Sequence, residues 1–64
     1  MKFSYDVLER YKKMPIQALE IIVDLSWELA NALDKPSKEY NRIQDIHTYA
    51  SIARDSYYRN IGRY

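Results

Sequence analysis

Two prolines and one late glycine divide this chain of 64 residues into three uninterrupted segments, and this punctuation constrains the fold more than any other feature. The prolines are Pro15 and Pro36, and the glycine is Gly62. Proline breaks the interior of a helix but fits its first turn, so one helix ends before each proline and the next begins there. The spacing predicts an all-α chain with helices over residues 4–14, 15–33 and 37–61.

The first segment has the pattern of a short amphipathic helix. Ser4 is a residue type favoured as an N-cap, and Phe3 before it can pack on Leu8 one turn into the helix. Apolar residues then recur at helical spacing: Val7, Leu8, Tyr11 and Met14. A helix this short is stable only with tertiary contacts, because isolated helices of this length are marginal in water.

The second segment is apolar around most of its circumference. The apolar arc consists of Ile16, Leu19, Ile22, Val23, Leu25, Leu29, Ala30 and Leu33. The narrow polar stripe consists of Gln17, Glu20, Asp24, Glu28 and Asn31. A helix with so wide an apolar arc is buried against more than one neighbour. We therefore expect this segment to be the central helix.

The third segment carries one continuous apolar seam. The seam consists of Tyr40, Ile43, Ile46, Ala50, Ala53, Tyr57 and Ile61. The two small residues in its middle, Ala50 and Ala53, allow another helix to approach closely. No segment of the chain alternates polar and apolar residues with period two, so we expect no strand.

Charge is distributed as basic, acidic and basic along the chain. Residues 1–14 have a net charge of +2, residues 15–34 of −4 and residues 35–64 of +3, which gives +1 overall. The acidic segment contains no lysine or arginine, so its carboxylates need cations from elsewhere. Either the segments neutralise one another on folding, or one charged face stays open to a partner.

The size and composition describe a single small helical domain over residues 1–64. A chain this short is marginal as a lone monomer, and without cysteine it has neither disulfides nor a thiolate metal site to stabilise it. No apolar run approaches the roughly 18 residues of a membrane span, and the start of the chain lacks a signal-peptide pattern. We expect a cytoplasmic protein that does not enter the membrane.

The lengths of the three helices predict an incomplete core. At about 1.5 Å per residue, the second and third helices are about 30 and 36 Å long, but the first is only about 15 Å. The long helices fold back at residues 34–37 into an antiparallel helical hairpin, and the first covers only the half near residues 16–23. The uncovered half contains Trp27, Ala30, Leu33, Tyr40 and Ile43. We expect a homodimer through these residues, with a monomeric three-helix bundle as the alternative.

Catalytic residues are scarce in this sequence. His47 is the only histidine, and no carboxylate lies at helical spacing to orient it as an acid or base. Glu20, Asp24 and Glu28 share one stripe, but di-metal sites in bundles also require Glu-x-x-His pairs, which the chain lacks. We therefore expect no enzyme, no metal site and no cofactor.

A helix-turn-helix over residues 25–46 is the alternative reading of the function. The small Ala30 fits the point where the two helices of such a motif touch. The turn position that usually holds glycine is Asp34, and the helix that would read the DNA groove is longer than recognition helices are. Glu28 would also lie near phosphates, where its charge is repelled. Nucleic acid is therefore the less favoured partner.

The carboxyl-terminal residues provide the candidate partner-binding site. Tyr57 and Ile61 complete the apolar seam, while Tyr58, Arg59 and Arg63 lie off it and are expected to be exposed. Tyrosine and arginine are enriched at the centres of protein interfaces and also stack on single-stranded nucleic acid. We hypothesise that these three side chains contact a protein partner.

Together these observations favour a small, non-enzymatic, protein-binding or regulatory module that acts through helical surfaces. Nothing in the sequence names the partner. Compact reading frames without catalytic residues are common in mobile elements such as phages, and size alone suggests such a source.

Overall fold

The computed structural model describes residues 2–62 and shows three helices, α1 (Tyr5–Lys12), α2 (Ile16–Ala32) and α3 (Lys38–Asn60). The described residues contain no strand, so the all-α prediction is confirmed. Each helix is one or two residues shorter at its ends than the sequence predicts. None of the three has the length and apolar character needed to cross a bilayer.

The starts of α1 and α3 are fixed by serine caps. Ser4 accepts a hydrogen bond on its hydroxyl from the backbone N–H of Val7, at 3.4 Å, and Ser37 accepts one from that of Tyr40, at 3.0 Å. Each bond satisfies a backbone donor that the first helical turn leaves open. Pro15 lies immediately before α2, as its N-cap, and not at the first helical position that we expected.

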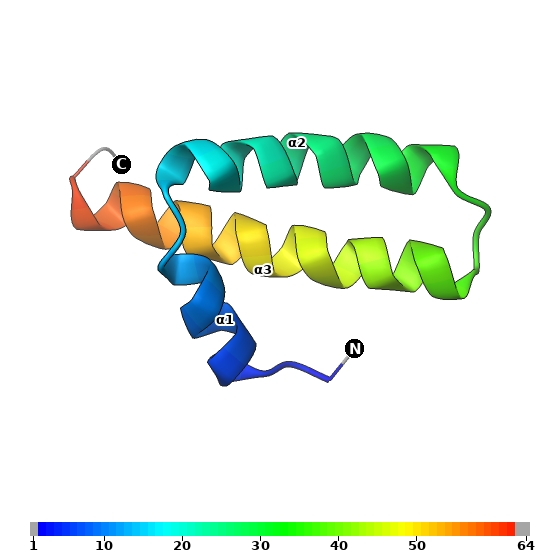
Figure 1. Ribbon diagram of the computed structural model, residues 1–64, viewed down its shortest axis with the longest axis horizontal. Coiled ribbons are helices and arrows are strands. Elements are labelled where there is room, and N and C mark those ends of the chain that lie inside the picture. Colours follow the sequence, from blue (N-terminus) through cyan, green and yellow to red (C-terminus); the bar gives the residue numbers. More distant parts are fainter. Residues whose placement is uncertain (1, 63–64) are drawn as a thin grey trace.

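The two long helices lie side by side and run in opposite directions, joined by residues 33–37 (Figure 1). Contacts between them are distributed along their length. Ser26, in the middle of α2, lies 3.0 Å from the ring nitrogen Nδ1 of His47, and Glu20 near its start is hydrogen bonded to Tyr58 near the end of α3. Residues 33–37 close one end of this pair of helices, and we call that end the tip.

The short helix α1 packs mainly on α3, at the half of the hairpin that contains residues 16–23. Figure 1 shows it crossing the flank of α3 that is turned away from α2. The anchor on α3 is Tyr49, a buried residue outside the predicted seam. Its ring lies 5.2 Å from that of Phe3 and 5.6 Å from that of Tyr11, and its hydroxyl accepts a hydrogen bond from the backbone N–H of Ser4.

One hydrophobic core joins all three helices at the end opposite the tip. Its buried members are Leu8, Leu19, Val23, Tyr49, Ala50 and Ala53. Ala50 is fully buried, as its place in the middle of the seam predicts. The last residues of the predicted seam, Tyr57 and Ile61, are exposed, because α3 extends past the start of α2 there.

Candidate functional site

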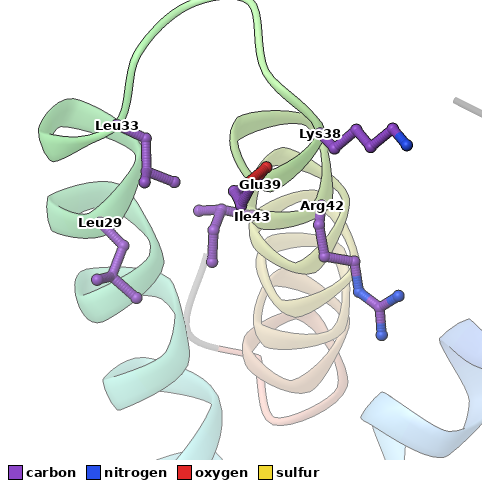
Figure 2. A pocket seen from close by; sticks show the side chains of 6 residues that line it. All are labelled: Leu29, Leu33, Lys38, Glu39, Arg42 and Ile43. Carbon is purple, nitrogen blue, oxygen red and sulfur yellow. The ribbon is translucent and has the colours of Figure 1, made fainter.

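The largest hollow described in the surface lies between α2 and α3 at the tip. It has a volume of about 500 Å³, and its lining consists of Leu29, Leu33, Lys38, Glu39, Arg42 and Ile43. Figure 2 shows Leu29 and Leu33 projecting from α2 toward Ile43 on α3, while Lys38 and Arg42 point away from them. The floor of the hollow is therefore apolar, and one of its edges is basic.

A second hollow continues from the first along the helices, away from the tip. It has a volume of about 220 Å³, and its lining consists of Ile22, Leu25, Ser26, Leu29, Ile43 and Ile46. The two hollows share Leu29 and Ile43, so they form one continuous depression. We call this depression the apolar groove, and its apolar residues are Ile22, Leu25, Leu29, Leu33, Ile43 and Ile46.

The groove exists because only part of the apolar arc of α2 faces α3. The buried residues of α2 recur at spacings of four, three and four, which is one helix face: Leu19, Val23, Ser26 and Ala30. The adjacent part of the arc stays open to solvent, with Leu25 51% and Leu29 42% exposed. Ile21 extends this open strip to the outer flank of α2 and is 63% exposed.

The rim of the groove carries opposite charges on its two sides. On the α3 side, Lys38 and Arg42 are exposed and line the groove at the tip together with Glu39, which leaves one net positive charge there. On the α2 side, the exposed Glu28 lies one turn from Leu25, since residues three apart are neighbours on a helix surface. Among residues 2–62, the side chains of Lys38, Arg42 and Glu28 form no ion pair. Both sides of the rim therefore have charges available for a partner.

The opposite flank of the hairpin holds a small polar cluster around Ser26 and His47. The hydroxyl of Ser26 donates a hydrogen bond to the carbonyl of Val23 at 3.1 Å, so it accepts from the Nδ1–H of His47 at 3.0 Å. The ring of Trp27 lies 6.0 Å from that of His47. Ser26 is only 3% exposed, so its hydroxyl supports the packing of α2 on α3 and is not open to a substrate. Within the described part of the chain, no three metal-ligating side chains converge.

The structure separates the five residues predicted as a dimer interface. Leu33 and Ile43 line the groove together. Ala30 is buried between α2 and α3, with 5% of its surface exposed. Trp27 and Tyr40 lie outside the groove, where Trp27 faces His47 and the hydroxyl of Tyr40 accepts a hydrogen bond from the Gln44 amide.

Leu25 and Leu29 are two groove residues that the predicted interface left out. Both belong to the apolar arc of α2, which the sequence displays. The arc alone does not say which of its members are left open, because that depends on which side of α2 the neighbouring helices occupy.

The predicted carboxyl-terminal site is only partly described. Tyr58 is half-buried, where the sequence predicts an exposed residue, and its hydroxyl donates a hydrogen bond to the carboxylate of Glu20 at the surface. This hydrogen bond raises the pKa of Tyr58 above its ordinary value. Arg59 is exposed and lines a polar hollow with Lys12. Arg63 lies outside the described residues.

Comparisons with protein-family models, with curated proteins and with solved structures found no match for this chain. No activity, ligand or partner is therefore carried over from a relative. The apolar groove and its charged rim are the features from which a function is inferred.

Proposed function

We propose that this chain is a non-enzymatic protein-binding module and that the apolar groove is its binding surface. The observation that carries this proposal is the continuity of the groove over two hollows lined by leucine and isoleucine from α2 and α3. Contiguous apolar surface with a polar rim is typical of protein interaction sites. A groove between two helices suits an amphipathic helix, which lays its apolar face between them.

Covering the groove would remove apolar surface of both long helices from water. Full burial of a leucine or isoleucine side chain contributes about 1.5 to 3 kcal/mol. Leu25 and Leu29 are each about half exposed, so covering them contributes about 1 kcal/mol apiece. Further apolar contact comes from Leu33, Ile43 and Ile46 on the floor of the groove, which are only partly buried.

The alternative of a helix-turn-helix DNA binder has less support. The two helices of that motif cross at about 90 to 120°. Figure 1 instead shows α2 and α3 side by side along their length, which leaves no separate recognition helix. Glu20, Asp24 and Glu28 also make the outer surface of α2 acidic, and this charge repels phosphate.

Three further expectations from the sequence belong to this proposal. A homodimer would cover the groove, although its interface would include Leu25 and Leu29 in place of Trp27 and Tyr40. A cytoplasmic location and contacts by Arg59 with a protein partner also remain predictions.

The proposal is tested with two matched variants of α2. Leu25 and Trp27 are two residues apart and similarly exposed, 51% and 59%, but only Leu25 lines the groove. We expect Leu25→Gln to reduce the recovery of protein partners from a cell lysate by the immobilised chain. Trp27→Gln removes apolar surface from the other flank and is expected to leave that recovery unchanged.

Circular dichroism of both variants controls for folding. Glutamine is a good helix former, and both positions are exposed, so we expect melting within about 0.5 kcal/mol of the wild type. Equal recovery by the wild type and the Leu25→Gln variant, with both chains folded and monomeric at the concentration used, would contradict the groove as the binding surface.

A further inference from the structure

We infer that the occupant of the apolar groove is a second copy of this chain, bound about a two-fold axis that runs parallel to α2 and α3. This inference rests on the proposed function, since it names the partner of the same surface. It is carried by charges of opposite sign beside one apolar face, namely Glu28 on α2, and Lys38 and Arg42, with Glu39 between them, on α3.

The first step is that the chain presents both halves of a self-complementary contact. A two-fold interface uses the same patch on both subunits, so the patch must contain a ridge as well as a hollow. The exposed strip of Ile21 and Leu25 on α2 is the ridge. The second hollow, between Ile22, Leu29 and Ile46, lies at the same level along the helices.

The second step is the direction of the axis. Rotation by 180° about a line parallel to the helices brings α2 of one copy over α3 of its partner. It also preserves the level of each residue along the helices. The ridge on α2 then lies beside the second hollow of the other copy, farther from the tip than Lys38 and Arg42.

The third step is the position of the charged residues along the helix axes. Ser26 lies level with His47, and Leu33 at the tip shares a hollow with Lys38. Interpolation between these two contacts places Arg42 within one helical turn of the level of Glu28. In the two-fold arrangement, Glu28 therefore approaches Arg42 of the partner subunit, and this contact occurs twice.

Charge also disfavours the other arrangement of the same two faces. If α2 lay over α2 of the partner, the carboxylates of Glu20, Asp24 and Glu28 would face one another. Like charges brought together oppose association, whereas opposite charges fix its register. The net charges of −4 over residues 15–34 and +3 over residues 35–64 thus favour α2 over α3.

The size of the face is adequate for a dimer. A standard stable interface buries about 800 Å² on each partner. The chain has 4991 Å² of accessible surface, so roughly one sixth of it would be covered. The groove side of two helices, of which α2 is about 25 Å long, is a face of that order.

The test is sedimentation equilibrium of the purified chain, with a charge-reversal cycle. We expect the wild type to have twice the chain mass at tens of micromolar. Because the contact occurs twice, Arg42→Glu is expected to raise the dimer dissociation constant by about tenfold. Adding Glu28→Arg to that variant restores an ion pair with the two charges exchanged. We expect this double variant to have a dimer dissociation constant within about threefold of the wild-type value. Lys13→Glu changes the net charge equally on an exposed residue outside the groove, and it is expected to have no effect.

The outcomes separate this inference from the proposed function. If the wild type has the mass of a monomer at several hundred micromolar, the second-copy inference is overturned. Loss of partner recovery in Leu25→Gln would still support the groove as a binding surface for another protein. A dimer that Leu25→Gln leaves intact overturns the second-copy inference, and equal lysate recovery by that variant overturns the proposed function as well. A dimer that Leu25→Gln weakens but the charge cycle does not affect overturns the two-fold arrangement.

Discussion

The hydroxyl of Tyr49 offers the sharpest test of how α1 is held. It accepts a hydrogen bond from the backbone N–H of Ser4 at 2.8 Å, across 45 residues of chain. Ser4 is also the N-cap of α1, so this single bond ties the start of that helix to α3. Tyr49→Phe removes the acceptor and keeps the ring and its contacts with Phe3 and Tyr11.

The magnitude follows from the burial of the two partners. An intramolecular hydrogen bond contributes about 0.5 to 1.5 kcal/mol net, and a donor left without a partner costs more when water cannot reach it. Ser4 is half-buried, so water replaces the lost acceptor only in part. We expect Tyr49→Phe to lower the free energy of unfolding by about 1 kcal/mol. This is a large fraction of the roughly 3 to 10 kcal/mol that a chain of this length has in total.

The assay is thermal unfolding followed by circular dichroism, at one fixed protein concentration because self-association would shift the melting temperature. A loss of about 1 kcal/mol lowers the melting temperature of a domain this small by about 4 to 8 °C. Tyr11→Phe is the matched control. Its ring stacks on Tyr49 in the same cluster, but its hydroxyl has no hydrogen bond among the described residues.

The contrast between the two variants decides the outcome. We expect Tyr11→Phe to melt within about 0.5 kcal/mol of the wild type. Hydrogen exchange of the α1 amides should accelerate in Tyr49→Phe only. If both variants melt alike and α1 keeps its protection, the hydroxyl of Tyr49 does not hold α1, and the reasoning is refuted.

Three further predictions address the caps, the tyrosine pair and the DNA alternative. Ser37→Ala removes the N-cap of α3 and should cost about 1 kcal/mol in thermal unfolding, whereas Ser51→Ala, within the same helix, should cost nothing; equal effects would contradict the cap. The raised pKa of Tyr58 means that its bond to Glu20 stabilises the fold fully below pH 10 and is lost as the pH rises above that value. The alkaline loss of stability should therefore be smaller in Tyr58→Phe, and an unchanged pH profile would show that the pair does not form. Finally, gel retardation should detect no binding to duplex DNA tighter than tens of micromolar at physiological salt, and tight, sequence-dependent retardation would restore the helix-turn-helix reading of residues 25–46.

Local chemistry in the sequence was sufficient to predict the three helices. Pro15 and Pro36 interrupt the chain, and Ser4 and Ser37 satisfy the first open backbone donors of α1 and α3. These signals act within one helical turn, so they can be read without knowledge of the neighbours. The fully buried Ala50 was predicted for a similar reason, because it lies at the middle of a seam with helical period.

The side of each helix that is covered was decided only by the tertiary structure. The helical period of a sequence shows on which side of the helix axis each side chain lies. It does not show the direction from which another helix approaches. The short α1 could have packed on either long helix, and its placement on Tyr49 leaves Leu25 and Leu29 open. The same ambiguity put Trp27 into the predicted interface, although the structure turns it toward His47.

Polar partners distant in sequence were also beyond prediction. Glu20 and Tyr58 are 38 residues apart, and their hydrogen bond depends on the register of α2 against α3. That register results from packing of the whole apolar face. No single residue determines how far one helix is shifted along the other. The sequence therefore determined which segments are helical and which residues are apolar. The packing of α1 and α2 on α3 decided which of those apolar residues are left open for a partner.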